Sequence, residues 1–230
     1  MKKKAVFNWS GGKDSALALQ TILNDNQLEV IALLTTINED TKTSSIHAIP
    51  TSLLEKQAAC IGIPLYMVPL AKDTKTYEQG MLEAVEHFKQ LGVTHFIFGD
   101  IFLADVKNYR ESKLNPLGIE VVEPLWGKSS EAVFADFLKS GIKTKIIVTQ
   151  ADKLDASFIG KEINEELLTL LPSGIDPCGE NGEYHTFSYD GPLFKTPVDF
   201  NLKETKFINY EFKMDDGTFK TFDYWQGILE

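Results

Sequence analysis

The stretch VFNWSGGKDSALALQTIL, residues 6–23, decides the fold class, because an apolar run changes directly into a helical pattern. The run KAVFNW, residues 4–9, predicts a strand, and DSALALQTILN, residues 14–24, predicts a helix with one apolar face. The corner between them is Ser10-Gly11-Gly12-Lys13-Asp14-Ser15. A strand that feeds directly into a helix is typical of α/β folds, where such a corner faces the ligand crevice.

Strand and helix patterns continue to alternate along the chain. Further strands are predicted at residues 29–37, 63–70, 93–100, 119–126 and 142–150. Further helices are predicted at residues 51–62, 76–92, 129–141 and 160–171. In the first of these helices, Ser52 and Glu55 predict a capping box, and Gly62 predicts the end. The alternation favours an α/β fold with a doubly wound, mostly parallel sheet, a Rossmann-like three-layer sandwich.

The tail has a different pattern. From about residue 186, runs of alternating apolar and polar residues replace the helical periodicity, and Asp216-Gly217 between two such runs predicts a β-hairpin. We therefore expect a main domain at residues 1–125 and a smaller α+β part at residues 126–230 that carries the hairpin.

Composition narrows the class of protein. The net charge of −10 lacks the basic excess that broad nucleic-acid binding requires. Cys60 and Cys178 are far apart and form no CxxC pair, so a zinc ribbon is not expected. The small number of cysteines is typical of a protein in a reducing compartment. The apolar run Ala5–Trp9 is too short for a signal-peptide core, and no run reaches transmembrane length. We expect a cytoplasmic protein with neither a membrane nor a stable nucleic-acid partner.

The corner has the chemistry of an anion site. Its two glycines permit positive φ angles and a close approach of the ligand, and the amides at a helix N-terminus favour an anion. The two serines add hydroxyl donors and Lys13 adds a cation. Asp14 would repel a phosphate unless a divalent cation bridges them, so it indicates either Mg²⁺ or a helix cap.

The corner is not the P-loop G-x-x-x-x-G-K-[ST]. That motif requires glycine at position 7 and Ser or Thr at position 14, where this chain has Phe7 and Asp14.

A second unusual loop is GIDPCGENGEYHTFSYDGPLF, residues 174–194. Glycines interleaved with acidic residues suit a tight polar loop that approaches a ligand, although a solvated surface loop has a similar composition. Its carboxylates could bind Mg²⁺, hold an ammonium ion or act as bases, and His185 could move protons near neutral pH. The candidate residues in this loop are Asp176, Glu180, Asn181, Gly182, Glu183 and His185.

Two more candidates lie between these loops. Gly99-Asp100 ends a predicted strand and faces the same crevice, so Asp100 is either a Mg²⁺ ligand or a helix cap. Arg110 could neutralise charge on a leaving group, or it could form a surface ion pair with Glu111.

These motifs together resemble a known family. SGGKDS is similar to the pyrophosphate loop of the N-type ATP pyrophosphatases, a branch of the adenine nucleotide α-hydrolase-like superfamily. DPCGENGEYHTF, residues 176–187, resembles the C-terminal hallmark of the diphthine–ammonia ligase family in that superfamily. The expected order is completed by SIHAIPTSLLEKQAACIGIPL (45–65), FIFGDI (96–101), YRE (109–111) and EPLW (123–126).

The resemblance implies an activity. Residues 1–125 would form an ATP pyrophosphatase domain and residues 126–230 a substrate-binding part. The family adenylates a carboxylate with ATP and Mg²⁺, releases pyrophosphate, and then forms an amide as ammonia displaces AMP. The acceptor in its archaeal and eukaryotic members is diphthine, a modified histidine on elongation factor 2. A homodimer is a possible assembly.

The resemblance also implies roles for the candidate residues. The ATP and Mg²⁺ site would comprise Ser10, Gly11, Gly12, Lys13, Asp14, Ser15, Thr35, Thr36, Gly99 and Asp100, with Asp14 and Asp100 as metal ligands. The second substrate would contact His47, Arg110, Asp176, Asn181 and Gly182. Catalysis would involve Lys13, Asp14, Glu180, Glu183 and His185.

Alternatives stay open at this stage. Ala48-Ile49-Pro50 follows His47 where the family usually has Gly-Val-Arg, so a different small-molecule or tRNA acceptor is an alternative to diphthine. Sulfonucleotide reductases share the first loop, but the acidic residues 180–183 disfavour an additional anionic substrate. A non-catalytic ATP-binding regulator is the alternative outside the enzymes.

Overall fold

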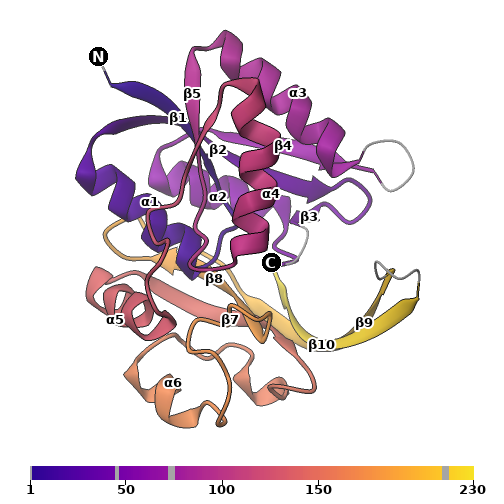
Figure 1. Cartoon of the computed structure of the whole chain (residues 1–230). Coiled ribbons are helices and arrows are strands. Elements are labelled where there is room, and N and C mark those ends of the chain that lie inside the picture. The colour runs from indigo at the N-terminus through magenta and orange to yellow at the C-terminus, as the bar shows by residue number, and fades with distance from the viewer. Residues whose placement is uncertain (1, 45–46, 72–75, 214–217) are drawn as a thin grey trace.

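The structure is a computed structural model that describes residues 2–44, 47–71, 76–213 and 218–230. These ranges contain two β-sheets, one in each half of the chain (Figure 1). Asp216-Gly217, where we expected a hairpin turn, lies outside the described residues. None of the described helices has both the length and the apolar composition that a membrane span requires.

The first sheet has the strand order β3-β2-β1-β5-β6, with β4 also paired to β2. Its strands are β1 (Lys3–Asn8), β2 (Leu28–Asn38), β3 (Thr43–Ser44), β4 (Leu65–Leu70), β5 (Val93–Ile97) and β6 (Glu120–Val122). All of these pairs are parallel except that of β2 with the two-residue β3. The predicted α/β fold with a mostly parallel sheet is therefore confirmed.

Helices cover both faces of this sheet. They are α1 (Lys13–Asp25), α2 (Thr51–Ile61), α3 (Tyr77–Gln90) and α4 (Ala104–Leu114), followed by the 3₁₀ turn η1 (Asn115–Leu117). Successive residues of β1 pack on opposite faces, because side chains alternate along a strand. Phe7 shares a buried cluster with Leu19 of α1, whereas Val6 shares one with Phe88 of α3.

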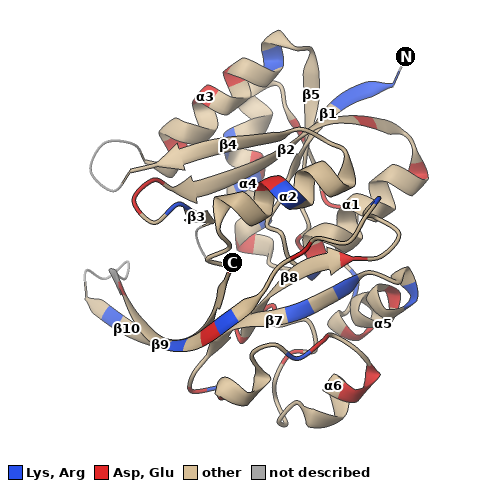
Figure 2. Cartoon of the chain, turned by 180° about the vertical axis from the view of Figure 1, so that it is seen from behind, with Lys and Arg blue, Asp and Glu red and all other residues tan. Residues whose placement is uncertain are grey.

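The second sheet is antiparallel, with the order β8-β7-β10-β9. Its strands are β7 (Lys143–Gln150), β8 (Tyr184–Asp190), β9 (Leu202–Lys213) and β10 (Phe219–Leu229), and its helices are α5 (Ser130–Ser140), η2 (Ala156–Phe158) and α6 (Glu165–Leu170). The hairpin β9–β10 curves away from the body (Figure 1). Basic and acidic positions are interspersed over the side shown in Figure 2.

Several local expectations were wrong. The helix predicted at residues 160–171 begins only at Glu165, and Glu162 instead forms a bridge with Lys145 of β7. Neither Asp14 nor Asp100 caps a helix, because no side chain caps α1 or α4.

The α/β alternation placed residues 142–150 in the parallel sheet, yet β7 has only antiparallel partners, because apolar periodicity reports burial and not strand direction. Helix α2 begins after Pro50 with no side-chain cap, so Ser52 lies inside the helix and forms no capping box with Glu55. Gly62 does end α2, in a left-handed conformation.

Helix α4 received no sequence prediction. Only Leu114 among its residues is buried, so it lacks the apolar stripe on which helix prediction depends. The omission matters because α4 carries Arg110.

Gln57 of α2 joins the glycine corner to the second sheet. Its side chain is completely buried. Its Nε2 donates to the carbonyls of Gly11, at 3.0 Å, and Ser188, at 2.6 Å, while its Oε1 accepts from Trp9 Nε1 at 2.9 Å. The backbone amide of Ser188 also donates to the Gly11 carbonyl, at 2.8 Å. One buried amide group therefore fixes the corner against α2 and β8.

Replacing Gln57 with leucine should lower the free energy of unfolding by about 3 kcal/mol, because buried polar groups would lose their partners at about 1–3 kcal/mol each. Urea unfolding would measure the change. Gln90→Leu at the exposed end of α3 is the matched control and should change stability by less than about 0.5 kcal/mol. Equal effects of the two substitutions would contradict the role of Gln57.

Candidate active site

A cleft of about 730 Å³ lies at the carboxyl ends of the parallel strands, where α/β folds bind ligands. One wall comes from the ends of β1, β2 and β5 together with the start of α1, and the opposite wall comes from residues 178–186. The two sequence motifs therefore face each other across the cleft. Lys13 Nζ donates to the carbonyl of Cys178, although more than 160 residues separate the two in the sequence.

Glycine is required at the corner. Gly11 has φ +84°, and an added Cβ would lie 2.6 Å from Ile49 Cδ1. Gly12 precedes α1 in an extended conformation, and an added Cβ there would lie 3.0 Å from both His47 Nε2 and Thr186 Oγ1. The two glycines thus let α2 and β8 pack directly against the corner, which leaves the helix N-terminus facing the cleft.

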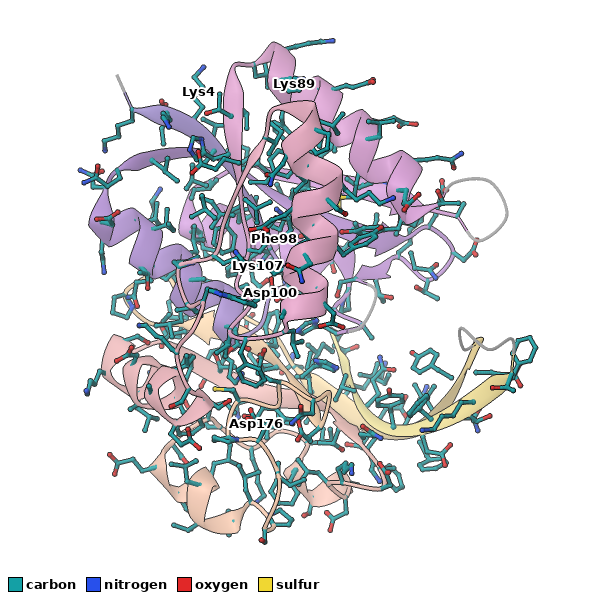
Figure 3. All side chains as sticks on the ribbon, viewed as in Figure 1. Lys4, Lys89, Phe98, Asp100, Lys107 and Asp176 are labelled. Atoms are coloured by element: carbon teal, nitrogen blue, oxygen red, sulfur yellow. The ribbon has the colours of Figure 1, made fainter. Side chains whose placement is uncertain are left out.

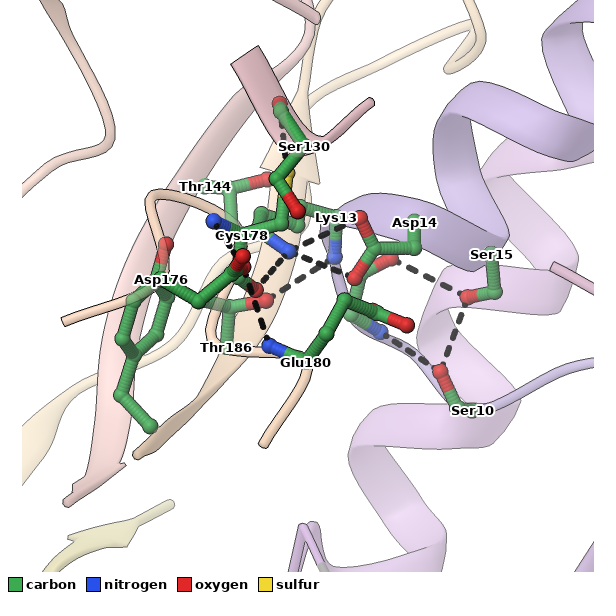
Figure 4. A network of polar contacts seen from close by, with 12 residues as sticks. Ser10, Lys13, Asp14, Ser15, Ser130, Thr144, Asp176, Cys178, Glu180 and Thr186 are labelled. Carbon is green, nitrogen blue, oxygen red and sulfur yellow. Dashed lines mark hydrogen bonds and ion pairs between the residues drawn. The ribbon is translucent and has the colours of Figure 1, made fainter. Parts of the chain in front are cut away.

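Lys13 is the centre of the polar network (Figure 4). Its Nζ lies 2.6 and 2.8 Å from the two carboxylate oxygens of Asp14 and also donates to the carbonyl of Cys178. Its backbone amide donates to Thr186 Oγ1 at 2.9 Å. Burial lowers the pKa of Lys13, but the charge of Asp14, the neighbouring Tyr184 and Cys178 and the hydrogen bond to Asp14 together outweigh this effect, so the net shift is upward and Lys13 stays cationic.

The two serines of the corner bond to each other. Ser10 Oγ donates to Ser15 Oγ at 3.0 Å, and Ser15 Oγ donates to the Gly12 carbonyl at 3.0 Å. Both serines line the cleft, so their hydroxyls can turn to an incoming anion without moving the backbone.

The acidic residues of the second loop divide into two groups. Glu183 is 3% exposed and accepts from the backbone amides of Asp176, at 3.1 Å, and Asn181, at 3.0 Å. Asp176 Oδ1 accepts from the amides of Cys178, at 2.8 Å, and Glu180, at 3.2 Å. These two carboxylates therefore fix the conformation of the loop. Glu180 lines the cleft, whereas Asp176, Asn181 and Glu183 do not.

Glu180 and two histidines have shifted proton affinities. Burial raises the pKa of Glu180 to about 7, with a further contribution from the charge of Asp14. Burial lowers the pKa of His185 to about 4, assisted by the charge of Lys13. The pKa of His47 is also well below its ordinary value, owing to burial and the neighbouring His185, whose ring centroid is 4.8 Å away. Near neutral pH the cleft thus holds two uncharged imidazoles and a carboxyl group that can gain or lose a proton.

A second charged cluster lies beside α4, where Figure 3 shows Phe98, Asp100 and Lys107 together. Arg110 contacts Asp100, lies 3.7 Å from Glu123 Oε1 and stacks over the ring of Phe98 at 4.0 Å. Lys107 lies 2.9 Å from Glu123 Oε2, and the Glu123 side chain is completely buried. Arg110 therefore has an acidic partner on the cleft side as well as one behind it.

Most of the predicted site residues line one cleft. They are Ser10, Lys13, Asp14, Ser15, Thr35, Thr36, His47, Gly99, Asp100, Arg110, Glu180, Gly182 and His185. The cleft lining does not include Gly11, Gly12, Asp176, Asn181 or Glu183. The Thr35 hydroxyl is committed to the Trp9 carbonyl, at 2.6 Å.

Sequence reasoning missed several lining residues. Thr186 lies within the quoted second motif but was not selected, and Tyr77, Tyr184 and Tyr224 also line the cleft. Thr186 could have been found as the polar residue directly after His185. Tyr184, directly before His185 in the same motif, could have been found in the same way. Tyr77 and Tyr224 carry no local signal, because only the tertiary fold brings them to the site.

The site offers carboxylates for a magnesium ion bound together with phosphates. Asp14 and Asp100 both line the cleft, and Mg²⁺ usually takes one or two protein carboxylates plus substrate oxygens and water. No group of three or more ligating side chains suited to a metal occurs among the described residues. The donor set fits an ion that arrives with a phosphate substrate.

Comparisons with known proteins identify the family of the chain. Residues 1–121 match the family model of the diphthamide synthase N-terminal domain, and residues 129–220 match that of the C-terminal domain. The chain is 28% identical over 216 residues to the diphthine–ammonia ligase of Schizosaccharomyces pombe, a match that covers 85% of this chain but 36% of that protein. It is 26% and 25% identical over 212 residues to the diphthine–ammonia ligases of Mus musculus and Homo sapiens, and each match covers 82% of this chain and 79% of the relative.

Substituting Glu180 with glutamine should change how stability depends on pH. Because folding raises the pKa of Glu180 to about 7, the native state keeps a proton that the unfolded chain releases above about pH 4.3. This contribution to stability is complete at low pH and is lost as the pH rises through 7. The free energy of unfolding of Glu180→Gln, taken relative to that of the wild type, should therefore be higher at pH 8 than at pH 5.

Urea unfolding at both pH values would measure this difference. The matched control is Glu131→Gln in the exposed first turn of α5, for which the difference from the wild type should be the same at both pH values. The assignment would be wrong if Glu180→Gln lost stability relative to the wild type as the pH rose.

Proposed function

The chain belongs to the diphthamide synthase family, and from this premise we propose that it is an ATP-dependent, amide-forming ligase. It would adenylate a carboxylate, release pyrophosphate, and then form an amide with ammonia. The observation that carries the proposal is the meeting of a cationic glycine corner with Glu180 and His185 across one cleft. The first feature suits a triphosphate and the second suits proton transfer to and from a nitrogen nucleophile.

ATP would bind with its triphosphate on the corner of residues 10–15. The support is a helix N-terminus, two serine hydroxyls and the Lys13 cation, all directed at the same space. The adenosine would lie at the end of β2, near Thr36, because the Thr35 hydroxyl is already bonded to the backbone. Gly99 follows β5 on the same side, and its absent Cβ allows α1 to approach, since an added Cβ would lie 3.1 Å from the Asp14 backbone.

Asp14 and Asp100 would hold Mg²⁺, which neutralises phosphate charge when it is bound. For this to happen Asp14 must exchange Lys13 for the metal and Asp100 must exchange Arg110, which keeps Glu123 as its acidic partner. Lys13 is then available for the β- and γ-phosphates. Lys13 and the corner amides would stabilise the pyrophosphate as it leaves, since charge neutralisation by preorganised donors is the main contribution to such transfers. The acceptor carboxylate attacks the α-phosphorus, the bond to the β-phosphate oxygen breaks, and an acyl-adenylate and pyrophosphate result.

The second step would use the other wall of the cleft. Ammonia attacks the acyl carbon, AMP leaves with the C–O bonding electrons, and one proton must be taken from the nitrogen. Glu180, with a pKa of about 7, can hold an ammonium ion in its ionised form and accept a proton at neutral pH. His185 and His47 are uncharged there, so either ring can also accept a proton or a hydrogen bond. Glu183, which we also predicted to be catalytic, would act by holding this loop.

The acceptor would lie between the two walls, against His47, Arg110 and Gly182, with residues 126–230 as the substrate-binding part. Asp176 and Asn181 would support this surface from within the loop. Diphthine on elongation factor 2 is the acceptor that the names of the relatives suggest. The enzyme would work in the cytoplasm.

Lys13→Ala should reduce the rate of pyrophosphate and AMP release from ATP by at least about 10²-fold, because it removes the cation that neutralises the leaving group. The assay contains Mg²⁺ and ammonium, with and without elongation factor 2 carrying diphthine. Lys139→Ala in the last turn of α5 is the matched control and should keep full activity.

The outcomes separate the activity from its substrate. Release that depends on the modified factor supports both the ligase and its acceptor. Pyrophosphate release that is the same with and without the factor supports the pyrophosphatase activity and indicates that the acceptor is another carboxylate. Full activity in Lys13→Ala would overturn the proposal.

A further inference from the structure

A second cavity of about 270 Å³ lies between α3 and α4. Its walls come from both helices and from Phe98 at the end of β5, on the face of the sheet opposite α1. We call it the α3–α4 pocket. The pocket is not explained by the ATP chemistry proposed above, since neither the glycine corner nor the loop at 176–183 contributes to it.

The lining of the α3–α4 pocket is mainly apolar. Met81, Val85 and Leu114 are buried members of the core on this face and form its floor. Leu82 and Tyr109, which are 44% and 42% exposed, form its outer edge. Ligand pockets typically combine such an apolar lining with a few polar groups at the edge.

The charged side chains around the pocket are matched by neighbours. Glu78 of α3 lies 2.8 Å from Lys113 Nζ of α4 and accepts from the Tyr109 hydroxyl at 3.1 Å, so these contacts tie the two helices together at the rim. Arg110 is paired with Asp100 and Glu123. Since no net charge is left to neutralise at these positions, the pocket favours an uncharged group.

The α3–α4 pocket adjoins the cleft. Tyr77, Met81, Phe98 and Arg110 line both cavities and so lie between them. A ligand in the cleft would reach the pocket at these side chains, where the Arg110 guanidinium stacks on Phe98.

We propose that the α3–α4 pocket binds a ring-sized, uncharged apolar group of the acceptor, whose carboxylate lies in the cleft. The substrate class is thus a carboxylate joined to an aromatic or branched aliphatic group. This inference rests on the proposed ligase function, within which it favours a small carboxylate with an apolar group over diphthine, the acceptor that the names of the relatives suggest.

The size of the pocket supports this class. An engineered apolar cavity of about 150 Å³ binds benzene, so a pocket of about 270 Å³ has room for one ring and its substituents. The adenine of ATP is a poor alternative occupant, because its ring nitrogens and amino group require hydrogen-bonding partners that the apolar floor lacks.

Binding of 4-fluorophenylacetate, measured by ¹⁹F NMR, tests the proposal, with fluoroacetate as the probe that lacks a ring. The wild-type protein should bind the ring-bearing acid at least tenfold more tightly. Leu82→Trp, which fills the pocket from an exposed position, should abolish this preference, and Leu117→Phe is a second filling variant. Leu91→Trp, at a site 46% exposed outside the pocket, should keep it.

MgATP is then added to the complex, and it should not displace 4-fluorophenylacetate. Displacement would identify the pocket as a nucleotide site and would overturn the inference, as would equal binding of the two probes or an unchanged preference in both filling variants. Because no turnover is measured, failure here leaves pyrophosphate release by the wild type intact. A protein that binds the probe as expected but releases no pyrophosphate would contradict the ligase proposal alone.

Discussion

The arrangement of the site depends on one buried cation. Lys13 is 2% exposed, and a buried ammonium requires partners for its charge and its three donors. Asp14 supplies the charge, the carbonyl of Cys178 supplies a second acceptor, and the ring of Tyr184 lies 5.6 Å away. These partners come from both halves of the chain, so the cation can be satisfied only when the second sheet is docked on the first. The same interaction that stabilises the docking also places the two walls of the cleft.

This constraint has a consequence for ligand binding. Asp14 is the acidic partner of Lys13, and under the proposed function an incoming phosphate would compete with it for the same cation. A metal ion that took Asp14 would leave Lys13 facing the phosphate, so the buried charge would never be without a partner. Asp14 therefore need not repel the substrate, although it lies next to an anion site. Of the two roles that the sequence offered for Asp14, the helix cap is wrong, because Gly12 is the N-cap of α1 and no side chain caps it. The role as a metal ligand stays a proposal.

Sequence reasoning succeeded where the signal is local. A strand, two glycines and a helix in immediate succession determine the corner, and the alternation of elements determines the parallel sheet. It failed where partners are set by the tertiary fold. Gln57 is an unremarkable helical glutamine in the sequence, yet it holds Gly11 and Ser188. Helix α4 was not predicted, because its contacts are charged pairs such as Lys107 with Glu123, which produce no apolar periodicity in the sequence.

The second loop shows why a motif cannot assign roles to each of its residues. A tight glycine-containing turn leaves backbone amides without helical or sheet partners, and they must be bonded by nearby side chains. Glu183 and Asp176 do this, and their carboxylates are consequently already occupied. Glu180 has no such task, so burial and the charge of Asp14 can raise its pKa toward neutrality. The same low-polarity surroundings lower the pKa of His185, which keeps the imidazole uncharged beside the Lys13 cation. Burial thus raises the pKa of an acid and lowers that of a base, so near neutral pH Glu180 can gain or lose a proton while His185 is uncharged.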